Sequence, residues 1–246
     1  MPYAELLEFN QPSPVRKEGY TKIRDAYPGL STTTQGFTMT PDGLMEVNQH
    51  APSYHDPERI VEFAGRSDYG VKNAQKLGSD ETIISRWIDS GHHSMLEFAS
   101  ATFYIECSRV VSHELVRHRL ASFQQESQRY VKYEDADPDA LFVLPDGLDE
   151  TLQSKVLEEY RAGLGAYRIL RDAGVKAQIA RYVLPNATMT RMVMKANLRE
   201  WRHIINLRTA KAAQPEMQEV AGMIEEQLLD IFPNIMYNVR SDGQIR

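Results

Sequence analysis

The chain has 246 residues, of which 42% are hydrophobic and 25% charged, a composition typical of one globular domain with a substantial core. Its formal net charge of -6 at pH 7 argues against broad electrostatic attraction to nucleic acid or to an anionic membrane, so a phosphate site must be built by local geometry. The single cysteine, Cys107, excludes an internal disulfide and a cysteine-built zinc site. The sequence shows neither a signal-peptide pattern nor an apolar run near the roughly 20 residues of a membrane span. We therefore predict a cytoplasmic protein.

Residues 1–55 show no sustained hydrophobic period and are rich in Pro, Gly, Ser, Thr and Asn. This composition predicts loops and short elements, which we expect to pack on the body of the protein. We find no internal repeat and no second domain, so residues 1–246 are expected to form a single domain.

The first clear helix is predicted to begin at Ser79, which can serve as its N-cap, and to end near Gly91, with His92 just beyond it. Its apolar stripe consists of Ile84, Trp87 and Ile88.

Alternation between apolar and polar side chains runs from Phe98 to Cys107 and is the clearest strand signal in the chain. Ser108 can cap a following helix from Arg109 to about Leu120. That helix would carry a basic triplet, Arg-His-Arg, at its C-terminal end.

Four later segments have helical periodicity, namely residues from about 150 to 172, a short stretch after Gly174, residues 197–208 and residues 215–232. Helices therefore outnumber strands. The predicted class is α+β, with a central, mainly antiparallel sheet packed against several helices.

The basic triplet opens the segment Arg117-His118-Arg119-Leu-Ala-Ser-Phe-Gln-Gln-Glu-Ser127-Gln-Arg129-Tyr. Successive side chains on a helix point about 100° apart, so at least one of the triplet must face inward. Guanidinium groups pair with phosphate or with a carbonyl edge, and Ser127 and Arg129 add further donors. A bare triplet is usually solvated surface, but the two glutamines and the following Ser-Gln-Arg-Tyr are not typical of a basic tail. We interpret the segment as an anion-binding core with room for two ligands.

The order Arg-His-Arg, seven residues, then Ser-x-Arg-Tyr resembles the signature of the flavin-dependent thymidylate synthases. The likeness covers roughly residues 80 to 210. Its further blocks, in preserved order, are Gly91-His92-His93-Ser94, Ala180-Arg181-Tyr182-Val183-Leu184-Pro185, Asn197-Leu198-Arg199 and Asn206-Leu207-Arg208.

This resemblance implies reductive methylation of dUMP to dTMP. The carbon donor would be 5,10-methylenetetrahydrofolate, released as tetrahydrofolate, and the hydride source would be FAD reduced by NADPH. The resemblance also implies a homotetramer whose sites are shared between subunits. The protein would supply orientation and charge complementarity, because the organic chemistry belongs to the cofactor.

The resemblance also assigns residues to each ligand. The flavin residues would be His92, Ser94, Arg117, His118, Arg119, Gln125, Asn197, Leu198, Arg199 and His203. The dUMP residues would be Glu114, Leu115, Val116, Arg117, Gln125, Glu126, Ser127, Gln128, Arg129, Arg181 and Arg208.

Three of the family positions depart from the common pattern. Members often carry glutamine where this chain has Glu114, asparagine where it has His203, and histidine where it has Phe98. A carboxylate at position 114 would repel a nearby phosphate unless it pairs with an arginine.

Arg208 is our candidate for the catalytic residue. Transfer of a methylene to C5 of uracil requires an electron-rich carbon, and a guanidinium that stabilises negative charge on N3 and the carbonyl edge favours that state. Arginine stays protonated near neutrality, so it would act as an electrostatic stabiliser and not as a general base. The alternative is a structural ion pair at a helix end.

Two other patterns predict no chemistry. Cys107 lies on the apolar face of the predicted strand, which indicates an inert core residue and not a thiolate that attacks uracil. His113 and His118 resemble a His-Glu-x-x-His zinc motif, but their five-residue separation turns them about 140° apart on a helix.

Two alternatives to the enzyme remain open at this point. One is a non-catalytic nucleotide or RNA phosphate-binding protein, in which Tyr130 and Tyr133 stack on bases. The other is a family relative that kept the fold and lost catalysis.

Overall fold

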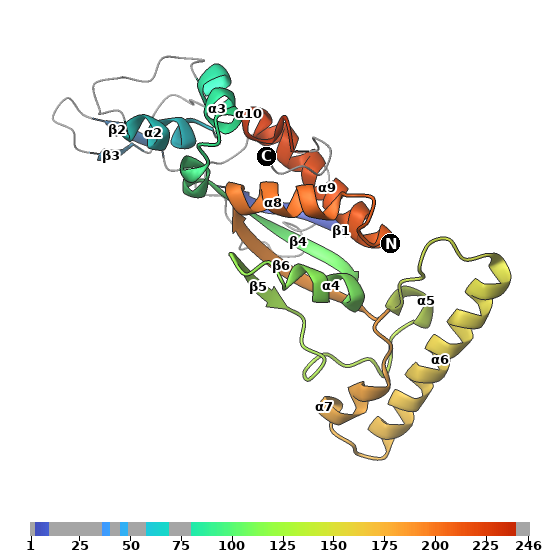
Figure 1. Ribbon diagram of the computed structural model, residues 1–246. Coiled ribbons are helices and arrows are strands. Elements are labelled where there is room, and N and C mark those ends of the chain that lie inside the picture. Colours follow the sequence, from blue (N-terminus) through green and yellow to red (C-terminus); the bar gives the residue numbers. More distant parts are fainter. Residues whose placement is uncertain (1–2, 10–35, 40–44, 49–57, 69–79, 240–246) are drawn as a thin grey trace.

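A four-stranded antiparallel sheet forms the centre of the protein, in the order β1-β4-β6-β5 (Figure 1). The computed structural model describes residues 3–9, 36–39, 45–48, 58–68 and 80–239. The sheet strands are β1 (Tyr3–Phe9), β4 (Ser100–Ser108), β5 (Ala121–Gln125) and β6 (Met189–Asn197). A separate two-stranded sheet consists of β2 (Gly36–Met39) and β3 (Met45–Asn48). The predicted α+β class and its antiparallel sheet are confirmed.

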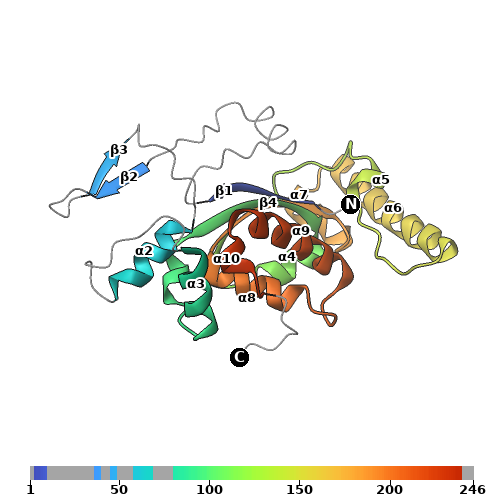
Figure 2. The same cartoon turned by 90° about the horizontal axis from the view of Figure 1, so that it is seen from above.

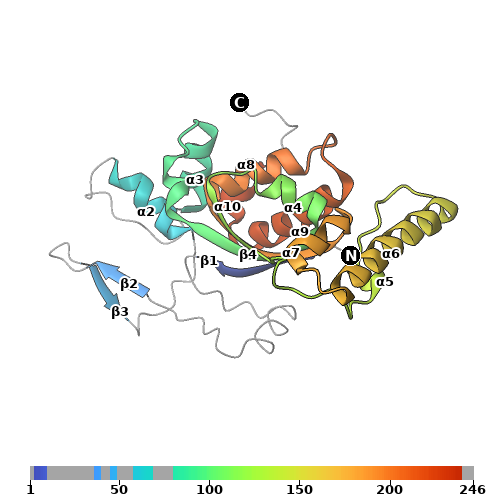
Figure 3. The same cartoon turned by 90° about the horizontal axis from the view of Figure 1, so that it is seen from below.

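Helices cover one face of the central sheet (Figure 2). These are α4 (Arg109–Leu115), α8 (Leu198–Arg208), α9 (Pro215–Ile231) and α10 (Pro233–Met236). At one end of the sheet lie α2 (Arg59–Ser67), α3 (Asp80–Asp89) and the 3-10 helix η1 (Ser94–Phe98). At the other end α5 (Pro138–Leu141), α6 (Glu150–Asp172), α7 (Ala177–Ala180) and the 3-10 helix η2 (Arg181–Val183) form a projecting group, here called the α6 arm (Figure 3). No helix in the described ranges is long and apolar enough to cross a membrane.

One apolar core lies between the sheet and the helices that cover it. Phe103 of β4, Met194 of β6, Trp201 of α8 and Ile224 of α9 are all fully buried in it. The indole N–H of Trp201 donates to the carbonyl of Ala101 at 3.0 Å, so the largest core side chain has no unpaired polar atom. A smaller apolar cluster is built around α6 and holds the arm together.

Helices with a strong period and a clear cap form where the sequence predicts them. α6, α8 and α9 match the predicted ranges to within one residue. Asn197 caps α8, since its side chain accepts from the N–H of Glu200 at 2.9 Å. Gly91 has a φ of +79°, the left-handed conformation that ends the preceding segment. The predicted cap at Ser79 and most of residues 1–55 lie outside the described residues.

The helix predicted after Ser108 begins at Arg109 with Ser108 as its cap, as expected. Its predicted end near Leu120 is wrong, because α4 ends at Leu115 and the chain then turns into β5. The predicted strand at 98–107 begins two residues later, after η1. β5 and β6 were not identified from the sequence. Burial does alternate along β6, since Met192, Met194 and Ala196 are buried while Arg191 and Lys195 are exposed, but Val193 interrupts the alternation of apolar and polar residues. Pairing of β6 with both neighbours decides these boundaries, because sheet hydrogen bonds outweigh local helical preference.

Candidate active site

The basic triplet lies in a turn between α4 and β5. The backbone N–H of Arg117 donates to the carbonyl of Glu114 at 3.2 Å, and the N–H of His118 donates to that of Leu115 at 3.1 Å. Arg117 and Arg119 are exposed, whereas His118 is only 5% exposed. One member of the triplet therefore faces inward as expected, although a turn and not a helix produces this arrangement.

Arg208, in the last turn of α8, meets this turn through its guanidinium group. Nη1 donates to Oε2 of Glu114 at 2.5 Å, and Nη2 donates to the Glu114 carbonyl at 3.2 Å. Nε donates to Nε2 of His118 at 3.0 Å. Three of the five guanidinium N–H groups thus bond within the chain, which fixes the side chain and leaves two donors. Arg208 also forms the ion pair at a helix end that the alternative interpretation predicts, with Glu114 as its partner.

His118 is neutral in this arrangement. Burial, followed by the nearby charges of Arg208 and His203, lowers its pKa to about 4. Nε2 can then accept the Arg208 N–H, which assigns the proton to Nδ1, and Nδ1 lies 3.4 Å from Oε1 of Glu200. Burial raises the pKa of Glu200, a buried carboxyl group of α8. His118 therefore connects α8 to the basic turn at two points.

Several of the residues expected to contact flavin lie at or beside the N-terminal end of α8. Ser94, the first residue of η1, is exposed, and so is His92, which lies just before this helix. The Leu198 N–H donates to the carbonyl of Ala99 at 2.9 Å and so joins the end of η1 to the start of α8. Leu198 is fully buried, so its side chain serves the core. Arg199 pairs with Glu97 at 2.6 Å.

Three further flavin candidates differ in what they contact. The exposed His203 ring lies 5.8 Å from the His118 ring, on the same side of α8 as the basic turn. Arg117 and Arg119 make no ion pair with any described residue. Two unpaired guanidinium groups in one turn suit a diphosphate such as that of FAD.

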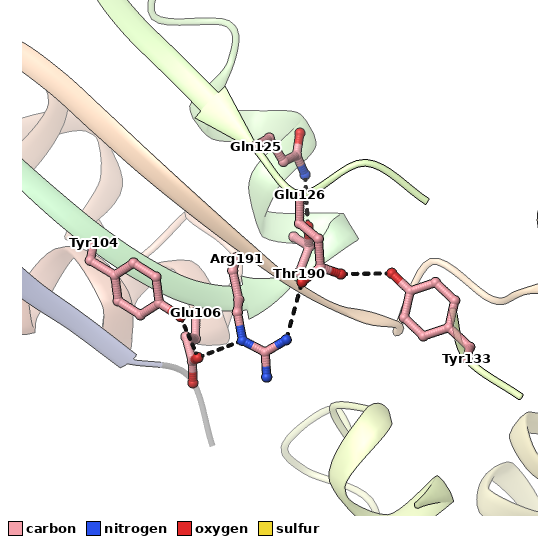
Figure 4. A network of polar contacts seen from close by, with 7 residues as sticks. All are labelled: Tyr104, Glu106, Gln125, Glu126, Tyr133, Thr190 and Arg191. Carbon is pink, nitrogen blue, oxygen red and sulfur yellow. Dashed lines mark hydrogen bonds and ion pairs between the residues drawn. The ribbon is translucent and has the colours of Figure 1, made fainter. Parts of the chain in front are cut away.

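The segment Gln125 to Arg129, here called the nucleotide loop, begins at the end of β5. The Gln125 amide donates to Oγ of Ser112 at 3.0 Å. It also donates to Oγ1 of Thr190 at 3.2 Å (Figure 4). The Glu126 carboxylate accepts from Tyr133 and Arg191, so it is already paired within the chain.

The remainder of the nucleotide loop combines one buried and one exposed side chain. The Ser127 Oγ accepts the backbone N–H of Arg129 at 3.3 Å, and Gln128 is buried. The exposed Arg129 guanidinium lies 5.5 Å from the centre of the Tyr130 ring. Arg181 lies apart from these residues at the start of η2 in the α6 arm, with no hydrogen bond to the nucleotide loop among the described residues.

Comparison with known proteins identifies the relatives of this chain. Residues 50–234 match the family model of the thymidylate synthase complementing protein. The chain belongs to this family. The flavin-dependent thymidylate synthase of Thermococcus kodakarensis is 38% identical over 179 residues, covering 72% of this chain and 69% of that protein. The enzyme of the same name from Geobacter sulfurreducens is 39% identical over 197 residues, covering 76% and 82%.

A solved structure has a similar fold. It is the UMP/dUMP methylase PolB from Streptomyces cacaoi, crystallised with 5-Br dUMP, with a TM-score of 0.64 and 25% sequence identity. The match covers 75% of this chain and 90% of the PolB chain.

In this member of the family, the lone cysteine belongs to the core. Cys107 has no exposed surface, and burial raises the pKa of its thiol to about 12. The predicted core role is confirmed. Base stacking on Tyr133 is wrong, because that ring is only 4% exposed and packs in the α6 cluster, whereas Tyr130 is 77% exposed.

Several residues that shape the site of this family member were not found from the sequence. Glu200 and Arg191 meet their partners only through the fold, since the partners are far away in the chain. Arg109, the first residue of α4, has a buried Nη1 with no hydrogen-bond partner among the described residues. The sequence carries no periodic signal for these contacts. A carboxylate at position 114 was expected to need an arginine partner if a phosphate binds nearby. Glu114 has such a partner in Arg208.

Proposed function

We propose that this chain is a flavin-dependent thymidylate synthase that methylates dUMP to dTMP. The observation that carries the proposal is the junction of the basic turn with Arg208, which lies 90 residues beyond His118 in the chain. This junction sets two unpaired cations, Arg117 and Arg119, beside a fixed guanidinium with two free donors. Family membership and the likeness to a dUMP methylase support the same reaction.

FAD would be held by the basic turn and the start of α8. Arg117 and Arg119 would bind its diphosphate, because exposed guanidinium groups without a carboxylate partner suit that charge. The remaining contacts would come from His92, Ser94, His118, Gln125, Asn197, Arg199 and His203. The fully buried Leu198 would support the site from the core. When bound and reduced by NADPH, FAD would supply the hydride and pass on the methylene carbon of 5,10-methylenetetrahydrofolate.

dUMP would bind at the nucleotide loop. Ser127, Arg129 and the loop amides would hold the phosphate, with Arg181 as a further cation. Residues 114–117 of another subunit would close the site, which makes a homotetramer with shared sites part of this proposal. The single-chain positions of Arg181 and Arg129, on the α6 arm and on the loop, are compatible with a site that several segments complete.

Arg208 would stabilise negative charge on the uracil ring. Its guanidinium keeps its charge at neutral pH and is fixed by Glu114 and His118 before a ligand binds. A fixed donor needs little reorganisation as charge develops at N3 and the carbonyl edge, which makes C5 a better nucleophile.

The direct test uses the purified full chain. A yellow preparation that converts dUMP to dTMP with NADPH and methylenetetrahydrofolate supports the proposal. A colourless protein that FAD cannot reconstitute would overturn it. A flavinated protein that binds dUMP without forming dTMP would instead identify a relative that lost catalysis.

A further inference from the structure

A row of alternating charges runs from β4 across β6 to the nucleotide loop that follows β5 (Figure 4). Glu106 of β4 lies directly opposite Arg191 of β6, and Arg191 Nε donates to Oε1 of Glu106 at 2.8 Å. Arg191 Nη1 donates to Oε2 of Glu126 at 3.1 Å, and the Arg191 carbonyl accepts the Glu126 N–H at 2.8 Å. One guanidinium therefore joins two carboxylates across the sheet.

The Glu126 carboxylate is held from a second side as well. Its Oε1 accepts the hydroxyl of Tyr133 at 2.7 Å, and its side chain is only 10% exposed. Burial, together with this hydrogen bond, raises the pKa of Tyr133, so the hydroxyl remains a donor at neutral pH. Both oxygens of Glu126 are thus occupied by partners in the same chain.

Gln125 is fixed on the opposite face of the sheet. Successive side chains of a strand point to opposite faces, and Gln125 bonds to Ser112 of α4 and Thr190 of β6 on the core side. Hydrogen bonds therefore hold the start of the nucleotide loop on both faces of the sheet, through Gln125 on one face and Glu126 on the other.

We propose that Arg191 is a positioning residue that fixes Glu126 and neutralises its charge where the phosphate of dUMP binds. The inference rests on the proposed function, because it takes Ser127, the next residue, as a phosphate contact. An unpaired carboxylate one residue away would repel the phosphate and leave the loop less constrained. Arg191 itself touches neither ligand in this scheme.

The test compares Arg191→Gln, Glu126→Gln and the double variant by calorimetric titration of the FAD-loaded protein with dUMP. Arg191→Gln should raise the Kd for dUMP and the KM about tenfold, equivalent to about 1.4 kcal/mol, with kcat and FAD content unchanged. The Kd of Glu126→Gln alone is the reference for the double variant, in which loss of Arg191 should change the Kd for dUMP much less than it does beside an intact Glu126. The double variant should recover most of the lost affinity, because the carboxylate that needed a partner is gone.

Arg161→Gln is the matched control. Arg161 pairs with Asp139 at 2.7 Å on the α6 arm, so the variant changes net charge equally without touching the loop, and its Kd for dUMP should not change. An unaltered Kd in Arg191→Gln, or no recovery in the double variant, would overturn the inference. If Arg191→Gln does not fold, Tyr133→Phe takes its place, with a severalfold weaker Kd expected and an unchanged Kd counting against the proposal. Either result is distinct from failure of the proposed function, in which the wild-type protein itself would not bind dUMP or form dTMP.

Discussion

Arg208 donates a hydrogen bond from Nε to Nε2 of His118 at 3.0 Å, although 90 residues separate them. His118 can accept this bond only while its imidazole is neutral, and Glu114 holds the other side of the guanidinium at 2.5 Å. The orientation of Arg208 therefore depends on one neutral ring and one carboxylate, both of which can be changed by mutation.

Arg208→Ala should abolish most dTMP formation while FAD remains bound. Loss of a fixed donor aimed at developing charge typically lowers kcat by roughly 100- to 1,000-fold. Release of tritium from dUMP labelled at C5 measures the step directly. If the flavinated variant releases tritium at the wild-type rate, Arg208 is not catalytic and its role is limited to the ion pair with Glu114.

Arg119→Ala should weaken FAD retention about tenfold or more, as expected for loss of one charge-assisted hydrogen bond. Because Arg119 is exposed, the melting temperature of the FAD-free protein should stay the same. Flavin absorbance after gel filtration gives the occupancy. Arg161→Ala serves as the exposed-arginine control, and a fully flavinated Arg119→Ala would show that this residue serves another ligand.

Glu114→Gln should bind dUMP a few-fold more tightly. The amide oxygen can still accept from Arg208, while the negative charge that opposes a phosphate is removed. Glu97→Gln, which alters the exposed pair with Arg199, is a suitable control. Weaker dUMP binding by Glu114→Gln would mean that the charge of Glu114 is needed to hold Arg208.

His118 should make the protein less stable as pH falls. Its pKa is about 4 in the folded chain against an ordinary value of 6.5, so the unfolded state binds more protons between these values. Stability attributable to His118 is present above pH 6.5 and is lost as pH falls toward 4, by about 3 kcal/mol at most.

Denaturant unfolding of wild type and His118→Gln at several pH values measures this difference. The raised pKa of Glu200 acts in the opposite direction, so the difference between the two proteins, and not the wild-type curve alone, reports on His118. Equal slopes for both proteins between pH 6.5 and 4 would contradict the prediction.

Cys107→Ala should keep full dTMP formation and lose about 1 kcal/mol of stability, because the side chain is a buried core group with a pKa near 12. Folded wild-type protein should also react slowly with a thiol reagent. Loss of turnover in a stably folded Cys107→Ala would mean that the thiol takes part in the reaction.

The sequence by itself determined the elements with a strong apolar period and a clear cap, such as α6 and α8. It also predicted anion binding by the Arg-His-Arg segment, which stays a prediction. Periodicity and side-chain chemistry are local properties, so they can be read along the chain. The end of α4 at Leu115 was not predictable in this way, because it depends on β5 pairing with β6.

The tertiary structure alone decided which polar groups meet. Arg208 with His118, and Arg191 with Glu126, are joined across 90 and 65 residues, and such single contacts leave no repeating pattern in the sequence. Burial also decided that His118 faces inward while Arg117 and Arg119 remain exposed. The sequence supplied the guanidinium groups, and packing of α8 against the turn and of β6 between its neighbours determined which of them are paired and which remain available to a ligand.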